Sequence, residues 1–346
     1  MRQDSRNFYK IIYQGDSIFA IYFATFVDFH TDTHNYISRF VHTYSASPGD
    51  FVDAYISERM MIDGSISDVD ALRSSIQAEL GISDSMLVNY FKWISGFPTG
   101  DFGYSFQHQK PVSDLIWGKL GLTFLITFVT LIFTLVTAFL TGIISAMKPY
   151  TVFDYVVSFF GFLGLAVPNF LLALLLMYFS LEWFGQPFSG LFSPEYINAD
   201  WSMDKFWDAM SHIWIPVIVV GTSGTAAQIR IMRATMMDEL HKPYVDTARS
   251  KGLPTYKVIL KYPVRHAVTP LASTIGWQLP NLVSGSAIVA IVLSLPTTGP
   301  YLLEALRGQD MYLAGTFLMM LAVLTIIGTL LSDIILALLD PRIRLS

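Results

Sequence analysis

Long stretches without a single charged side chain are the feature of this 346-residue sequence that most restricts its fold. Residues 120–147, 155–181, 267–303 and 311–332 contain no Asp, Glu, Lys or Arg. A helix needs about 20 apolar residues to cross the hydrocarbon core of a bilayer. A fifth, shorter stretch at 213–229 contains Gly, Ser, Thr and Gln, which suit close packing between membrane helices. We therefore predict an all-α polytopic membrane protein.

The overall composition excludes several other classes of protein. The chain is 53% hydrophobic and only 14% charged, whereas a typical soluble domain is about 25% charged. Disorder needs low hydrophobicity and high net charge, and this chain has neither. The net charge of −5 argues against a nucleic-acid partner. The absence of cysteine excludes disulfides and thiolate sites, and we expect this chain to bind no metal and no cofactor.

The signs of the remaining charges predict which segments face the cytoplasm, because cytoplasmic loops are rich in Lys and Arg. Segment 230–266 holds eight basic residues against three acids, so we place it in the cytoplasm together with the tail that carries Arg342 and Arg344. Segment 50–118 holds ten acids against four basic residues, and 185–212 holds four acids against one lysine. Both should lie outside.

A weak first span completes this topology. Residues 18–27 are mildly apolar and follow Arg2, Arg6 and Lys10. Counting them as a span gives about six in total and places both termini in the cytoplasm; a re-entrant or interfacial segment is the alternative. The expected organisation is an N-terminus with the weak span (1–46), an external acidic segment (47–118) and a transmembrane core (119–346) with a cytoplasmic loop at 234–265. Apolar spacing in 65–80 and 86–94 predicts a small external cap.

The cytoplasmic segment contains a pattern typical of two helices joined by a break. Pro243 can open the first helix, and Ala248 leaves room for close approach. Gly252 can take the left-handed conformation that ends a helix, and Pro254 suits the start of the next one. An apolar face for the second helix is supplied by Val258, Ile259 and Tyr262. A short helix with small residues, a fixed break and surrounding positive charge is a docking element for a cytoplasmic partner.

This segment resembles the coupling loop of permease subunits of ATP-binding-cassette importers, in the dipeptide, oligopeptide and nickel branch. The residues that carry the resemblance, and that it identifies as contacts to the ATPase, are Tyr244, Asp246, Thr247, Ala248, Arg249, Lys251, Gly252 and Leu253. The similarity continues through Arg265, His266, Ala267 and Pro270, and is visible at 47–50, 100–105, 165–168 and 339–344.

The resemblance implies a set of partners and a cellular location. Such a permease forms the translocation path with a second, homologous permease in a bacterial or archaeal cytoplasmic membrane. Two cytoplasmic ATPase subunits bind ATP and Mg, and an extracytoplasmic solute-binding protein delivers the cargo. Peptides are the cargo that the resemblance favours, and oligosaccharides or nickel complexes are alternatives.

Motifs of enzymes are missing from the sequence. A phosphate-binding loop needs a glycine five residues before its Gly-Lys pair, but Gly118 and Lys119 are preceded at that place by Ser113. No His-Glu-x-x-His or Gly-x-Ser-x-Gly pattern occurs either. We therefore predict a transport subunit that does not hydrolyse ATP. A stand-alone secondary transporter or channel is the more distant alternative, and a membrane-embedded enzyme would need a catalytic cluster that we do not find.

Two further groups of residues have both a functional and a structural interpretation. Asp28, His30, Asp32 and His34 alternate as metal ligands would, in a segment where the family has an apolar span; we interpret them as a solvated connection. Candidates for the pathway or a hinge are Pro168, Pro216, Pro280 and the intramembrane Asp333. Prolines kink membrane helices and free carbonyl groups, and an intramembrane carboxylate is costly and often functional, although ordinary packing or pairing explains each as well.

Overall fold

The computed structural model describes residue 56 and residues 69–80, 86–105, 107–185, 189–197 and 199–339. These residues are helical apart from loops and one pair of two-residue strands, so the all-α prediction is confirmed. The predicted first span, the residues at 28–34, the motif at 47–50 and the tail at 340–346 lie outside the described residues. The chain divides into two compact units, residues 1–121 with 300–323 and residues 122–299 with 324–346.

The first unit contains the predicted external helices and a short hairpin. Its described elements are α4 (Val69–Leu80), α5 (Met86–Gly96), the 3-10 turn η1 (Phe97–Thr99), strands β1 (Tyr104–Ser105) and β2 (Lys110–Pro111), the start of α6 (Val112–Met147), most of α16 (Thr298–Arg307) and the first part of α17 (Met311–Leu339). The strands pair antiparallel. Buried Asp310 holds the hairpin through a 2.6 Å hydrogen bond from the Ser105 hydroxyl.

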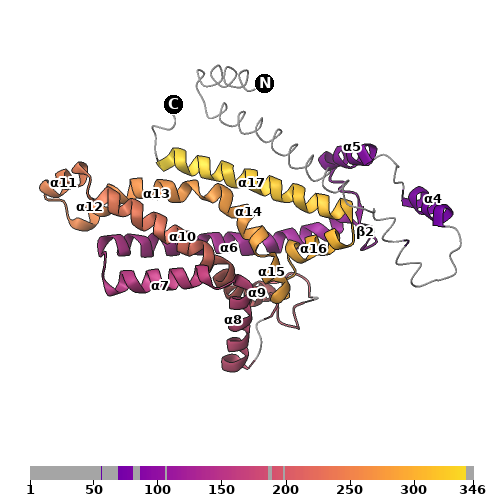
Figure 1. Cartoon of the computed structure of the whole chain (residues 1–346), viewed down its shortest axis with the longest axis horizontal. Helices are drawn as coiled ribbons and strands as arrows, with labels where there is room; N and C mark the ends of the chain where they lie inside the picture. The colour runs from indigo at the N-terminus through magenta and orange to yellow at the C-terminus, as the bar shows by residue number, and fades with distance from the viewer. Residues whose placement is uncertain are drawn as a thin grey trace, which may run out of the picture. The chain divides into compact units, whose positions relative to one another are not determined.

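The second unit is a bundle of long apolar helices (Figure 1). Besides the remainder of α6 and α17, its elements are α7 (Val152–Ala166), α8 (Asn169–Phe184), α9 (Met203–His212), α10 (Trp214–Leu240), α11 (Pro243–Ser250), α12 (Thr255–Lys261), α13 (Pro263–Ser273), α14 (Ile275–Gly285) and α15 (Ala287–Val292). Figure 1 shows α11 and α12 together at one end of the bundle, beyond α10.

Among the described residues, four helical segments are long and apolar enough to cross a membrane: α6, α10, the segment Ile275–Val292 and α17. They coincide with four of the predicted spans. The remaining predicted span, which begins with the uncharged stretch 155–181, is a bent pair of helices and not one straight helix, because the chain bends by 107° between α7 and α8. Pro168 explains the break, since proline has no N–H to continue a helix and restricts the residue before it.

Small residues allow α10 to pack closely on α6 and on α7. A Cβ added to Gly221 would lie 2.9 Å from Phe133 of α6, and one added to Gly142 of α6 would lie 2.7 Å from Met232. This order of contacts makes α6 and α10 parallel. On α7, a Cβ added to Gly164 would clash with Thr222 of α10. These glycines therefore set the close spacing of the bundle, as small residues do in membrane interfaces.

Candidate functional site

The predicted break between two short helices is present in the loop that follows α10. Lys242 is extended, Pro243 occupies the first turn of α11, and the helix ends at Ser250. Gly252 has a φ of +72°, in the left-handed region, and a Cβ added there would meet nothing within 4 Å. Its backbone conformation, and not crowding, is therefore what requires glycine. Pro254 then caps the start of α12.

The inner face of α11 is apolar and packs within the same chain. Val245 and Ala248 are buried in one cluster with Val258 of α12, and Tyr244 and Tyr262 pack at its edge. The small side chain of Ala248 therefore lets α11 pack closely against α12. This packing fixes which side of α11 points outward.

The outer face of α11 and the turn after it is polar. Asp246, Thr247, Arg249 and Lys251 are exposed, and Leu253 adds one apolar side chain that is 37% exposed. Arg249 and Asp246 form an ion pair of 3.5 Å between two exposed side chains, which contributes little to stability in water. The exposed face therefore presents both signs of charge around an apolar tip.

Tyr244 ties α11 to the end of α10. Its hydroxyl donates a hydrogen bond to the Glu239 carboxylate, and its ring lies 5.7 Å from the His266 ring and 6.5 Å from the Tyr262 ring. Burial, and after it the Glu239 carboxylate, raises the pKa of Tyr244 well above its ordinary value. The hydroxyl consequently keeps its proton and remains a hydrogen-bond donor.

The base of the loop is a packed junction between α10, α12 and α13. The Thr235 hydroxyl of α10 donates to the Ala267 carbonyl of α13 at 3.0 Å. Met232, Met236 and Ile259 are buried in the same apolar cluster. Displacing α12 would thus displace α10 and α13 as well.

A buried ion pair joins this junction to α7, and the sequence interpretation missed it. Arg233 donates two hydrogen bonds of 2.8 Å to the carboxylate of Asp154, which also accepts from the Tyr150 amide at 2.9 Å. The sequence counted Arg233 only as one of eight basic residues in the cytoplasmic segment. A signal was present, because Asp154 is the one charged residue between Lys148 and Glu182.

The candidate pathway residues do not form one site. Pro168 stands at the break before α8, Pro280 lies inside α14, and Pro216 lies in the first turn of α10. Asp333 lies in α17 and is half-buried, and its carboxylate has no hydrogen bond or ion pair with any described residue.

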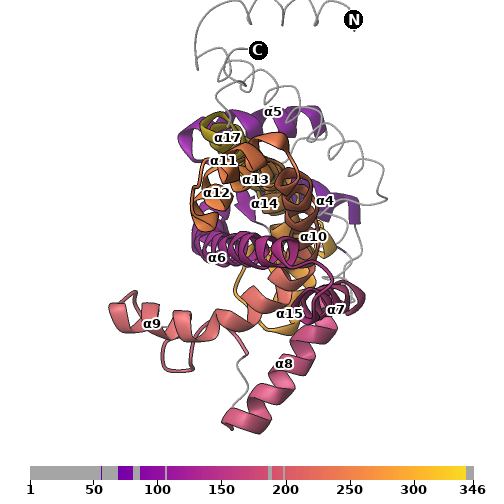
Figure 2. The same ribbon diagram turned by 90° about the vertical axis from the view of Figure 1, so that its left-hand side faces the viewer.

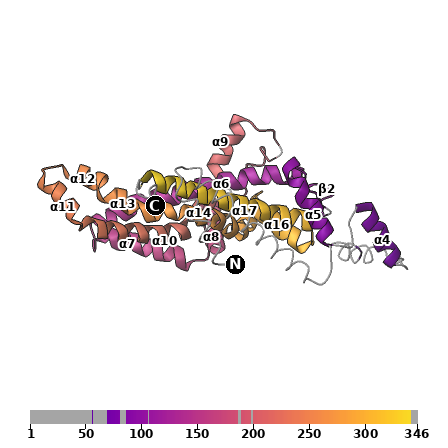
Figure 3. The same cartoon turned by 90° about the horizontal axis from the view of Figure 1, so that it is seen from above.

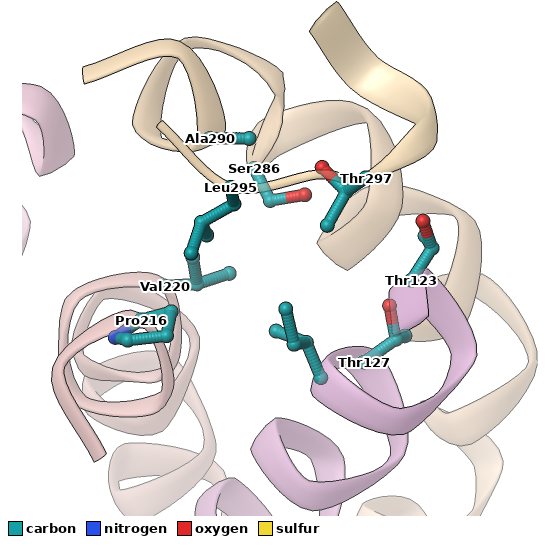
Figure 4. A pocket seen from close by; sticks show the side chains of 9 residues that line it. Thr123, Thr127, Pro216, Val220, Ser286, Ala290, Leu295 and Thr297 are labelled. Carbon is teal, nitrogen blue, oxygen red and sulfur yellow. The ribbon is translucent and has the colours of Figure 1, made fainter. Parts of the chain in front are cut away.

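Pro216 lines a small pocket of uncharged side chains (Figure 4). The lining comes from α6, α10, α15 and the segments that flank α15, and consists of Thr123, Ile126, Thr127, Pro216, Val220, Ser286, Ala290, Leu295 and Thr297. The Thr123 hydroxyl accepts from the Thr298 amide at 2.9 Å. No group of three or more metal-type side chains occurs in the part of the chain that the structure describes.

Comparison with known proteins identifies relatives over most of the chain. Residues 138–345 match the family described as "Binding-protein-dependent transport system inner membrane component". The oligopeptide transport system permease protein AppB of Bacillus subtilis is 32% identical over 86% of this chain and 91% of its own length. The dipeptide transport system permease protein DppB of Escherichia coli is 29% identical over 78% of this chain and 85% of its own. Among solved structures, an inward-facing MetNI methionine ABC transporter aligns with 66% of this chain and 96% of that chain, at 15% identity and a TM-score of 0.44.

Proposed function

This chain belongs to the binding-protein-dependent transport system inner membrane components, and from that membership we propose that it forms half of the translocation path of an ATP-driven peptide importer. It is a permease subunit of an ABC transporter and not an enzyme. The peptide cargo is supported by relatives that are named as oligopeptide and dipeptide permeases and that cover most of the chain.

The proposed assembly contains four kinds of partner. A second, homologous permease supplies the other half of the path, and two cytoplasmic ATPase subunits bind ATP and Mg. A solute-binding protein delivers the peptide on the extracytoplasmic side, and membrane lipid surrounds the spans. Family membership supports the ATPase and the binding protein as general classes of partner.

The geometry of α11 is the observation that supports the coupling role most strongly. A helix with a buried apolar inner face and an exposed face of Asp246, Arg249 and Lys251 is suited to a partner in water. Its connection through α12 to the junction with α10 and α13 gives a rigid route for motion. We propose that residues 244–253 dock on an ATPase subunit and carry its movement into the spans.

The proposed orientation places both termini in the cytoplasm of a bacterial or archaeal cell. The parallel contacts of α6 and α10 support it, because two parallel helices in a membrane end on the same side. The eight basic residues of 230–266 at the end of α10 support the cytoplasm as that side.

Uptake into proteoliposomes tests the transport function. The complete complex, with its ATPases and binding protein, should accumulate a radiolabelled di- or oligopeptide only when ATP is supplied. ATP-driven uptake of a labelled oligosaccharide or nickel complex, with no uptake of peptides, would assign one of the alternative cargoes. Uptake by the purified chain alone without ATP would instead indicate a secondary transporter or channel.

Cross-linking tests the docking site. Because the chain contains no cysteine, Leu253→Cys introduces a single thiol at the exposed tip of the loop. We expect a bifunctional reagent to join it to the ATPase subunit. Met203→Cys on α9, which is 71% exposed, is the matched control and should give no such product. A product from Met203→Cys but not from Leu253→Cys would refute the assignment of the coupling loop.

A further inference from the structure

Helix α9 is a surface helix that the transport function leaves without a role. It ends at His212, and α10 begins at Trp214 without an intervening loop. Figure 3 shows α9 lying across the direction of α10, and Figure 2 shows it projecting from the side of the bundle. Because α10 crosses the membrane, a helix that ends where α10 begins and lies across it runs along the membrane surface.

One face of α9 is fixed by contacts within its own unit. Lys205, Ala209 and His212 are buried. The Lys205 ammonium donates a 2.5 Å hydrogen bond to the Ala199 carbonyl and lies 4.8 Å from the centre of the Phe192 ring. The one Lys or Arg of this helix is thereby turned inward, against an aromatic ring that attracts a cation.

A second polar anchor holds the helix to the loop before it. The Asp208 carboxylate accepts hydrogen bonds from the Ser193 amide at 2.8 Å and the Ser193 hydroxyl at 2.6 Å. The Ser202 hydroxyl caps the N-terminus by accepting from the Lys205 amide. These contacts determine the rotation of α9 about its axis, and so determine which side chains face outward.

The outward face is a stripe of large apolar side chains. Met203, Phe206 and Trp207 share one side of α9 and are exposed, whereas Met210, which follows at helical spacing, is partly buried against the core of the unit. Met203 is 71% exposed and Trp207 is 64% exposed, and Trp201 just before the helix is also exposed. Contiguous exposed apolar side chains of this size mark an interaction surface.

We infer that this stripe, residues 203, 206 and 207, is an interfacial anchor that inserts into the boundary between lipid headgroups and acyl chains. An amphipathic helix in the membrane plane buries its apolar face at that depth, and tryptophan is enriched there. Figure 3 shows α9 lying across the direction of α10, which is how a helix in the membrane plane lies relative to a spanning helix.

The charges on α9 also specify the kind of lipid. With Lys205 buried, the charged side chain that remains exposed on the helix is Asp204, on the polar edge. Such a helix has no cation to offer an anionic headgroup, in contrast to the Lys- and Arg-rich helices that bind acidic membranes. The stripe therefore fits zwitterionic lipid.

Site-directed fluorescence tests the anchor in the complete complex. Single cysteines at Met203 and Trp207 are labelled with an environment-sensitive fluorophore, and the complex is placed in phosphatidylcholine nanodiscs. Nitroxide-bearing lipid should quench both labels several-fold more strongly than aqueous iodide does. Asp204→Cys is the matched control on the polar edge and should show the reverse preference. Retained ATP-driven uptake in parallel proteoliposomes verifies that each labelled complex is folded.

Every other pattern overturns the proposal. Quenching of positions 203 and 207 by iodide would place the stripe in water. Protection from both quenchers would show that a protein, either the second permease or the binding protein, covers it. Quenching that increases severalfold when phosphatidylglycerol replaces half of the phosphatidylcholine would refute the preference for zwitterionic lipid.

Discussion

Helices α9 and α11 are built alike but differ in the chemical character of the face that they expose. α9 has 10 residues and α11 has 8, and each follows or precedes α10 directly at one of its ends. Each has a buried alanine on its inner face, Ala209 in α9 and Ala248 in α11. The outer face of α9 is apolar, whereas that of α11 is charged.

This difference shows that the inner face holds a surface helix in place and the outer face selects what it meets. The apolar stripe of α9 gains free energy only where water is absent. The charged face of α11 loses no hydration in water and can form salt-dependent contacts with a soluble protein. On the two proposals above, the two ends of α10 therefore meet different partners.

Overpacking the buried alanines should give the largest effect and separate the two roles. Ala248→Trp adds bulk to a packed cluster and should destabilise the loop by about 3 kcal/mol. We expect ATP-driven uptake and co-purification of the ATPase to be lost while membrane insertion persists. Ala209→Trp should displace α9 and leave co-purification of the ATPase intact. Equal loss in both variants would show that the helices are not independent.

Backbone strain at two matched glycines should give the next largest effect. Gly252 and Gly185 have φ values of +72° and +73°, and an added Cβ meets nothing within 4 Å at either. Valine should therefore cost about 2 kcal/mol at both, from the left-handed conformation alone. We expect Gly252→Val to abolish ATP-driven uptake and Gly185→Val to reduce it little. Unchanged uptake in Gly252→Val would remove the coupling role from this loop.

The hydrogen bond between Tyr244 and Glu239 should make a smaller, pH-dependent contribution to the stability of the loop. Tyr244→Phe should lower the stability of the loop by about 1.5 kcal/mol near neutral pH, because it removes a hydrogen bond to a charged acceptor. Since the pKa of Tyr244 is raised in the folded chain, its contribution is fully present below the unfolded value of about 10 and falls as pH rises above it.

Thermal unfolding of the purified complex between pH 7 and 11 measures the contribution of this hydrogen bond to stability. The loss of stability above pH 10 should be smaller in Tyr244→Phe than in the native protein. Tyr256→Phe, at a tyrosine of α12 that is 62% exposed, is the matched control and should leave both the neutral stability and the alkaline slope unchanged. An alkaline slope that persists in Tyr244→Phe would contradict the assignment.

The smallest effect on stability should come from the exposed charge of α11. Asp246→Asn removes one partner of a surface ion pair and should change stability by less than about 0.5 kcal/mol. It should nevertheless weaken co-purification of the ATPase in a salt-dependent manner. Trp207→Ser on α9 is the comparison and should leave that association unaltered at every salt concentration. A salt-independent loss would mean that Asp246 acts through folding.

Sequence alone predicted the features that depend on neighbouring residues. Uncharged runs located the spans, since length and apolarity are sufficient for a helix to cross a bilayer. Gly252 and Pro254 located the break between α11 and α12, because their backbone preferences are local. The motif at 244–253 was sufficient to indicate the family, because its residues are contiguous in the chain.

Features that depend on distant parts of the chain required the tertiary structure. Asp154 and Arg233 are 79 residues apart, and no local pattern pairs them. The proline at 168 predicted a kink, but its 107° angle depends on what α7 and α8 pack against. Segment 185–212 was interpreted only as an acidic connection, although it contains the apolar stripe of α9.

The sequence by itself determined where four long apolar helices lie, because hydrophobicity and charge belong to each residue and its neighbours. Tertiary structure decided which face of each helix is free. Burial of Ala248 and Lys205 assigns the inner sides of α11 and α9, and that burial arises from contacts with other elements. The physical reason is that a helix exposes whatever its packing leaves uncovered, and packing is a property of the whole fold.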